Sequence, residues 1–398
     1  MKKLKNKVRW TVINLCRLAL AFTFIFSGTV KLIDPQGTQY KIEDYATAFG
    51  LESLVPLFVP ICLAVALALL EFMLGINFFF GIRRRMTSIV TLVFLLVMTP
   101  LTLYLAISNP VTDCGCFGDA LKLTNWQTFG KNVALTLMAL VVMRRPRMMT
   151  RFITERNQWT ISLYSLIFGL VLALYDIHRL PVIDFRPYHV GVDLPKAIME
   201  EWNDTETEPQ YLDFSIQTLE GEDITFDWLQ QPGYKFLLAA PFLEVADDGA
   251  MDQLNDVYDY AQQQGYPFLC LTSSLQESIG RWKDLTGAEY PFAWTDGIVL
   301  KTVIRSNPGL LLLKDGVIVN KWPNTNLPSY EELNAPLEKL EMGEPQTSNN
   351  LRRALKLLLW FIIPLLLFTS VDRIWVGSKF YKKYKIRHTN QKQQTQEQ

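Results

Sequence analysis

Two cysteines one residue apart, Cys114 and Cys116, are the side chains of this sequence best suited to redox chemistry. They lie in the stretch VTDCGCFGDA between two apolar runs, and Gly115 leaves the backbone between them free to turn. A disulfide needs Cα atoms about 4.4–6.8 Å apart, which residues two apart in a turn can reach. The ring that results is small and strained, and strained disulfides are easier to reduce. The spacing therefore favours a redox-active thiol pair.

Two other roles for this pair remain open on the sequence alone. The first is a static disulfide that fixes the loop. The second is zinc binding together with Asp113 or Asp119, but one-residue spacing suits a tetrahedral site poorly and no histidine is near in sequence, so no metal site is expected. Cys62, about five residues inside the outer end of the second apolar stretch, could act as a third thiol.

Six apolar stretches are long enough to cross a bilayer, which takes about 17–25 residues. They cover approximately residues 10–30, 55–80, 87–107, 126–143, 159–177 and 354–371. Lysine and arginine gather at the N-terminus, in GIRRRM, in RRPRMMTRFITER and in the C-terminal tail, that is, at every second connection. This pattern predicts a multi-pass protein of a bacterial inner membrane with both termini in the cytoplasm. The cysteine loop then faces the oxidising periplasm, where disulfides persist.

The insert between the last two stretches, residues 181–350, is acidic and alternates strand-like with helix-like patterns, which predicts a periplasmic α/β domain. We expect strands at YLDFSIQTL, KFLLAAPFL, PFLCLTSS, LLLLKDG and VIVNKWPN, and helices at GAMDQLNDVYDYAQQQG, QESIGRWKDLTG and SYEELNAPLEKLEM. The order resembles the thioredoxin-like fold, with Asn307-Pro308-Gly309 where that family has its cis-proline. The Cys-x-x-Cys of the family is missing, and Cys270 lies inside an apolar strand, so a docking role is expected.

Two ionisable residues, Arg17 and Glu71, interrupt the first and second apolar stretches. A charge inside a membrane is costly and usually has a partner. If the two stretches form an antiparallel hairpin, both residues come to a similar depth, which predicts an intramembrane ion pair. The alternative is that Arg17 extends to the inner headgroups while Glu71 is protonated.

The stretch FIFSGTVKLIDP, taken together with Arg17 and Glu71, resembles the DoxX family, and DCGCFGD resembles the related MauE group of methylamine-utilisation proteins. The resemblance covers about residues 8–145 and also includes Ser27-Gly28 and Lys31. It implies a four-helix membrane core. It further implies a role in maturing a disulfide-rich periplasmic enzyme, as for MauE, or in quinone-linked sulfur oxidation, as for DoxX. The cofactor stays unknown; a loop that accepts electrons from substrate thiols needs an electron sink, and a membrane quinone is the candidate.

We therefore expect an α-helical membrane bundle of about six spans, with a DoxX/MauE-like four-helix core, plus an α/β thioredoxin-like soluble domain. The expected order is the four-helix domain (1–150), a fifth span (151–180), the periplasmic domain (181–350), and a sixth span with a basic cytoplasmic tail (351–398).

The predicted function is periplasmic thiol-disulfide chemistry or maturation of exported proteins through the Cys-Gly-Cys loop. The alternatives are a non-catalytic scaffold that recruits a periplasmic partner, and a subunit of a quinone-linked oxidoreductase. Whether the protein is an enzyme stays open; if it is, a thiol-disulfide oxidoreductase is expected. Its partners would be the lipid bilayer and periplasmic proteins or membrane redox proteins. Nucleic acid is not expected, because basic and aromatic residues do not cluster together.

Overall fold

The computed structural model describes residues 2–51, 54–56, 58–111, 115–203, 211, 213–345 and 350–396. The chain forms two compact units. One, the helical unit, comprises Met1–Leu174 and Arg352–Gln398; the other, the sheet unit, comprises Tyr175–Leu351. The sheet unit is therefore an insertion in the chain of the helical unit, joined to it at both ends.

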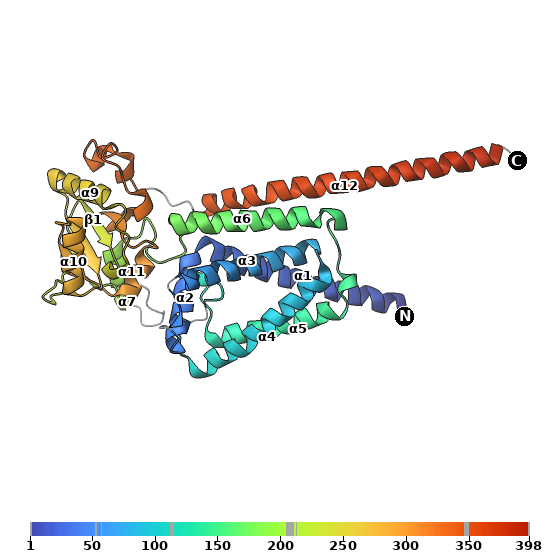
Figure 1. Ribbon diagram of the computed structural model, residues 1–398, viewed down its shortest axis with the longest axis horizontal. Helices are drawn as coiled ribbons and strands as arrows, with labels where there is room; N and C mark the ends of the chain where they lie inside the picture. Colours follow the sequence, from blue (N-terminus) through green and yellow to red (C-terminus); the bar gives the residue numbers. More distant parts are fainter. Residues whose placement is uncertain are drawn as a thin grey trace. The chain divides into compact units, whose positions relative to one another are not determined.

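Four helices of the helical unit form a bundle beside α6 (Gln158–His178) (Figure 1). They are α1 (Lys2–Ile33), α3 (Val59–Phe80), α4 (Arg84–Ser108) and α5 (Asn125–Arg144). All four contribute buried apolar side chains to one core, among them Leu20, Phe78, Leu95 and Leu135. A shorter helix, α2 (Pro35–Ala48), follows α1, while α6 and the long α12 (Asn350–Gln396) run beside each other.

Five helices in the described part of the chain are long and apolar enough to cross a membrane: α1, α3, α4, the helix at Glu155–His178, and α12. This confirms a helical membrane core. The fourth expected span is α5, whose 20 residues give a length of about 30 Å, the thickness of the hydrocarbon core. Its hydropathy is lower because it carries polar side chains, of which Asn125, Thr128 and Asn132 are buried in the bundle. That α5 crosses the membrane stays a prediction.

Two glycines let α1 and α3 approach each other closely. A Cβ atom at Gly28 would lie 2.4 Å from the backbone nitrogen of Phe72, and one at Gly75 would lie 2.5 Å from that of Ile25. Small residues at such contacts are typical of helix pairs in membranes. Since the two contacts fix the register of the helices, they decide which side chains of α1 face which side chains of α3.

The sheet unit contains a five-stranded mixed sheet in the order β3-β2-β1-β4-β5. The strands are β1 (Tyr234–Ala239), β2 (Phe268–Thr272), β3 (Phe292–Trp294), β4 (Gly309–Lys314) and β5 (Val317–Pro323). β1, β2 and β3 are parallel, and the β4–β5 hairpin is antiparallel. The bond between Asn307 and Pro308, just before β4, is cis, as expected. This is the thioredoxin-like arrangement, and it confirms the predicted α/β domain.

Both faces of this sheet are buried, which explains the uninterrupted apolar runs of β1, β2 and β4. Alternate strand residues enter two separate cores. Helices α9 (Met251–Gln264) and α10 (Gln276–Thr286) contribute to one core. Helices α7 (Leu194–Asn203), α8 (Thr225–Leu229) and α11 (Gly297–Val303) contribute to the other. The core on the α9 side takes up Cys270 completely.

Two expected elements of the sheet unit are wrong. The predicted strand at YLDFSIQTL makes only isolated bridges, both at Gln217. The predicted helix at SYEELNAPLEKLEM is replaced by turns and two short 3-10 segments, Leu337–Lys339 and Glu341–Gly343. Pro336 explains the second error, because proline disfavours the helical conformation of the residue before it and lacks a donor N–H. Two of the apolar residues that suggested a helix, Leu333 and Leu337, are instead buried in the core that contains α9 and α10.

A cluster of three charges, in which Arg186 and Lys321 are buried and Asp184 is partly exposed, joins β5 to the segment that enters the sheet unit. Asp184 accepts hydrogen bonds from Arg186 Nε at 2.7 Å and from Lys321 Nζ at 3.3 Å. Burial opposes ionisation of Asp184, but Arg186 and Lys321 outweigh it and hold the pKa of this carboxyl well below its usual range. A carboxyl with a depressed pKa stabilises the fold above its unfolded pKa of about 3.9, and this contribution is lost as the pH falls through the folded pKa.

We therefore expect amide-exchange protection in β5, corrected for the intrinsic exchange rate, to fall as the pH is lowered below about 4. In Asp184→Asn the protection should be lower at pH 6 and should change less with pH. Asp252→Asn, at an exposed position of α9, is the matched control and should keep the wild-type pH profile. An unchanged profile in Asp184→Asn would contradict this assignment.

Candidate functional site

Three buried polar side chains meet between α1 and α3. Lys31 Nζ donates to both carboxylate oxygens of Glu71, each at 2.7 Å. Ser27 Oγ lies 2.6 Å from Glu71 Oε2 and 3.1 Å from Lys31 Nζ. Lys31 and Glu71 are each about 4% exposed. The cluster is therefore an ion pair removed from water, with the hydroxyl of Ser27 contacting both charges.

The α1–α3 register explains why these three side chains meet. Ser27 and Lys31 are four residues apart on α1, so they lie on one face of the helix. Gly28, beside Ser27, contacts the backbone at Phe72, the residue after Glu71. A buried charge is tolerated only when it is paired and its hydrogen bonds are satisfied, and here the carboxylate receives bonds from both neighbours.

The predicted Arg17–Glu71 ion pair is wrong: the partner of Glu71 is Lys31. Because Glu71 lies at the level of Ser27 and Lys31, Arg17 lies about three to four turns further along α1, about 15–21 Å away at 1.5 Å per residue. The sequence estimate placed the two residues by their distance from the ends of the apolar stretches. It erred because it aligned the inner ends of the two stretches, whereas the close contacts of α1 with α3 at Gly28 and Gly75 place Arg17 at the level of the end of α3.

Arg17 instead binds the connection between α5 and α6. Its Nη1 donates to the backbone carbonyl of Thr150, and its guanidinium lies 5.2 Å from the centre of the Phe152 ring. Asn14, one turn earlier, accepts a hydrogen bond from the Thr150 N–H and donates to the Met148 carbonyl. The partner of Arg17 is thus a backbone carbonyl, which the positions of charged residues in the sequence do not reveal.

The loop that carries the cysteines is anchored on this cluster. Ser27 Oγ lies 2.7 Å from the backbone carbonyl oxygen of Cys116, and its single proton is shared between this carbonyl and Glu71 Oε2. The next residue, Phe117, is buried, with its ring 5.3 Å from that of Phe26 and 4.2 Å from Lys131 Nζ. Cys114, the other member of the predicted redox pair, lies outside the described residues.

Gly115 is needed for this path of the loop. Its φ of +63° is a conformation that favours glycine, and a Cβ atom there would lie 2.9 Å from the side chain of Lys41 on α2. Gly115 therefore packs against α2.

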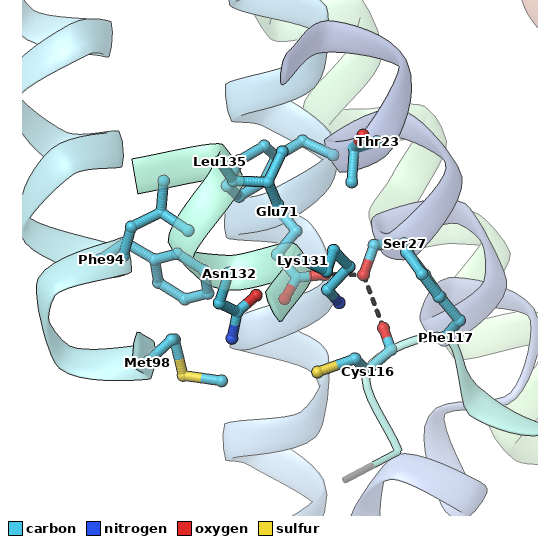
Figure 2. Close-up of a pocket in the computed structure, with 12 residues that line it drawn as sticks. Thr23, Ser27, Glu71, Phe94, Met98, Cys116, Phe117, Lys131, Asn132 and Leu135 are labelled. Atoms are coloured by element: carbon cyan, nitrogen blue, oxygen red, sulfur yellow. Dashed lines mark hydrogen bonds between the residues drawn. The ribbon is translucent and has the colours of Figure 1, made fainter. Parts of the chain in front are cut away.

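A small cavity of about 30 Å³ lies beneath the loop. Figure 2 shows it among the side chains of Ser27, Glu71, Cys116, Lys131 and Asn132, with the sulfur of Cys116 directed to the side where Asn132 lies. Apolar residues complete the lining: Phe24, Phe94, Leu95, Met98, Phe117 and Leu135. A water molecule needs roughly 10–15 Å³ on this measure, so the cavity has room for about two. The ring of a quinone does not fit it, and we derive no step through a quinone.

The other cysteines lie elsewhere. Cys62 is exposed on α3 and is not among the residues that line the cavity, so the structure does not bring it to Cys116. Cys16 packs against the core of the bundle. Cys270 is fully buried in β2, where burial raises the pKa of its thiol and so disfavours the reactive thiolate.

The edge of the sheet unit where thioredoxin-like enzymes carry their thiols has other chemistry. After β1, Glu244 accepts a hydrogen bond from Ser274 Oγ at 2.8 Å. Asn307, before the cis-proline, donates from Nδ2 to the carbonyl of Phe242 at 2.8 Å. This edge is therefore held together by hydrogen bonds and has no thiol. Over the described ranges, no group of three His, Cys, Asp or Glu residues is placed to hold a metal ion.

Lys131 and Asn132 are site residues that the sequence analysis did not single out. Lys131 was visible as a charge within a predicted span, but its target, an aromatic ring in a loop, leaves no local pattern. Ser27 and Lys31 entered only through the family resemblance, although their four-residue spacing at the end of an apolar helix is a usable signal.

The fold and this site define a multi-pass membrane protein with a thioredoxin-like domain inserted in its chain and a cysteine-bearing loop anchored on a buried ion pair. Residues 9–145 match the family model described as Methylamine utilisation protein MauE. The match covers about a third of the chain, including α1, α3, α4 and most of α5, and it confirms the MauE resemblance. Comparison with curated proteins finds no match.

Solved structures that this chain resembles share little sequence with it. Thiol peroxidase from Chromobacterium violaceum is 10% identical over 32% of this chain and 82% of its own, with a TM-score of 0.25. An uncharacterized conserved protein from Geobacillus kaustophilus is 14% identical over 40% of this chain and 85% of its own, with a TM-score of 0.27. The Bacterioferritin Comigratory Protein of Xanthomonas campestris is 12% identical over 29% of this chain and 83% of its own, with a TM-score of 0.22.

Proposed function

We propose that this protein exchanges disulfides with exported proteins at the outer surface of a bacterial inner membrane, through Cys114 and Cys116. In this proposal both termini are cytoplasmic and the sheet unit is periplasmic. The distribution of basic residues at every second connection supports that orientation. The exchange assists maturation of the client proteins.

The observation that carries the proposal is the anchoring of Cys116. Its carbonyl is bound by Ser27, its neighbour Phe117 is buried, and its sulfur is directed toward a cavity lined by charged and polar groups. If a structural disulfide were enough to fix the loop, the buried ion pair beneath the loop would not be needed. The same contacts fix the backbone of a reactive cysteine, which must present its sulfur in a defined direction.

A single exchange balances between the loop and one client. One loop thiolate attacks a client disulfide, so that a mixed disulfide forms and a client thiolate leaves. The second loop thiolate attacks the mixed disulfide and releases the second client sulfur. The client gains two electrons and two protons, and the loop becomes a disulfide; the reverse sequence oxidises a client dithiol.

The sheet unit serves as a docking module for clients in this proposal. Its only cysteine is buried, and its thioredoxin-like edge carries Glu244 and Ser274 in place of thiols. Being joined to the helical unit at both ends, it would raise the effective concentration of a bound client near the loop.

Trapping of mixed disulfides tests the function. We expect one of the two single variants, Cys114→Ser or Cys116→Ser, to accumulate client adducts that reducing agent releases, because the remaining thiol cannot resolve the intermediate. The double variant should trap nothing, and Cys62→Ser should trap no more than wild type. Adducts should be identified by mass spectrometry after acid quenching of intact cells.

If neither single variant forms adducts, and alkylation shows both loop cysteines permanently oxidised, the exchange function is wrong. The protein would then act as a non-catalytic scaffold, the interpretation favoured by the lack of a thiol at the edge of the sheet unit.

A further inference from the structure

We propose that Lys131 is the positioning residue that makes Cys116 the attacking sulfur of the pair, leaving Cys114 as the resolving one. This inference rests on the proposed function and says which of the two sulfurs attacks the client. Lys131 on α5 contacts Phe117, the residue that follows Cys116 in the loop.

The ammonium of Lys131 lies against the Phe117 ring of the cysteine loop. Its Nζ lies 4.2 Å from the centre of the Phe117 ring, close enough for a cation–π interaction. Lys131, Phe117 and Cys116 line the same small cavity. Figure 2 shows Lys131 extending into the space between Glu71 and Cys116. One aromatic ring therefore links the position of the cation to that of the cysteine.

Among the described lysines around Cys116, Lys31 and Lys41 are in ion pairs and Lys131 is not. From α1 and α3, Lys31 and Glu71 form an ion pair and cancel each other. From α2, Lys41 packs on Gly115 and lies 3.8 Å from Asp44. Within the loop, Asp119 adds a negative charge. Lys131 makes no ion pair with any described residue, so its charge acts on the cavity.

A positive charge beside a cysteine favours the thiolate, which is the nucleophile in disulfide exchange. The apolar side chains of Phe94, Leu95 and Phe117 line the cavity, and low local polarity strengthens the attraction between two opposite charges. Cys116 loses its proton to solvent, and the thiolate attacks the client sulfur with the ammonium nearby.

The test is the pH dependence of alkylation of Cys116 in full-length protein that carries Cys114→Ser, resolved by peptide mass spectrometry. In Lys131→Met the pH midpoint of alkylation should rise by about one unit, so that the rate at pH 7 falls about five- to tenfold. Lys131→Arg should keep the original midpoint. Lys122→Met, an exposed lysine of the same loop, is the matched control and should also keep it.

A purely structural role of Lys131 would give a different result. It would lower thermal stability or expose Cys116, but would leave the pH midpoint in place, and that outcome would overturn the inference. Phe117→Leu provides a second variant, which removes the ring that seats the ammonium. It should move the midpoint in the same direction by a smaller amount, and no movement in either variant refutes the proposal.

The trapping experiment separates this inference from the function. If Cys116 attacks, Cys114→Ser accumulates client adducts and Cys116→Ser does not; the opposite pattern keeps the exchange function but overturns the role of Lys131. A midpoint that depends on Lys131 without any trapped client would support the activation of Cys116 and refute the exchange with clients.

Discussion

Replacing Glu71 with leucine is expected to lower the free energy of unfolding by about 3–5 kcal/mol, because it leaves the ammonium of Lys31 buried without a counter-charge. Lys31 is only 4% exposed, so the charge cannot be hydrated without opening the bundle. The variant also removes a partner of the Ser27 hydroxyl. Thermal unfolding of the detergent-purified protein, together with its abundance in membranes, measures the effect.

The double variant Lys31→Met with Glu71→Leu is the control that separates charge from packing. Replacing a buried ion pair by apolar residues of similar size is often neutral or stabilising, so most of the lost stability should return. The anchoring of the loop should not return in full, because Ser27 would lack its charged neighbours. A double variant as unstable as the single one would show that the pair matters through shape and not through charge.

Replacing Gly28 with valine is expected to cost about 3 kcal/mol or more, since even a Cβ atom would lie 2.4 Å from the backbone of Phe72. Backbone atoms cannot rotate away as a side-chain end can, so α1 and α3 must separate. We expect low accumulation of the protein and faster alkylation of Cys116, because the contacts of Ser27 depend on the α1–α3 register.

The matched control for Gly28 is Gly130 on α5, a helical glycine where an added Cβ atom would meet no described atom outside its own helix turn within 4 Å. Alanine there should be tolerated and could stabilise the helix by up to about 1 kcal/mol, the difference in helix propensity between the two residues. If Gly130→Ala proves as harmful as Gly28→Val, close helix packing is not the cause of the Gly28 effect.

Much of the architecture follows from local sequence patterns. Each of the six apolar stretches contains a long helix, because length and apolar composition decide whether a segment can form a membrane helix. In the sheet unit, Gly265 ends α9 with a φ of +74°, and the bond before Pro308 is cis, both at positions where the residue type constrains the backbone. The wrong helix at SYEELNAPLEKLEM shows the limit of such patterns, because the prediction followed the apolar periodicity and ignored the constraint that Pro336 places on the backbone.

The partners of the charged residues at the site are decided by how the helices pack. The sequence placed charges at Arg17 and Glu71, but their partners, the Thr150 carbonyl and Lys31, are 133 and 40 residues away in the chain. Which side chain meets Glu71 is decided by the helix register at Gly28 and Gly75, a property of two backbones in contact.

The sequence by itself determined that this is a membrane protein with an inserted α/β domain and a Cys-Gly-Cys loop, because composition and residue type act over a few turns of chain. Only the tertiary structure decided that the loop is anchored through Ser27, 89 residues from Cys116, and that Lys131 approaches it from α5. Such contacts form when helices pack, and the free energy that selects them is shared among side chains too far apart in the sequence to leave a common pattern.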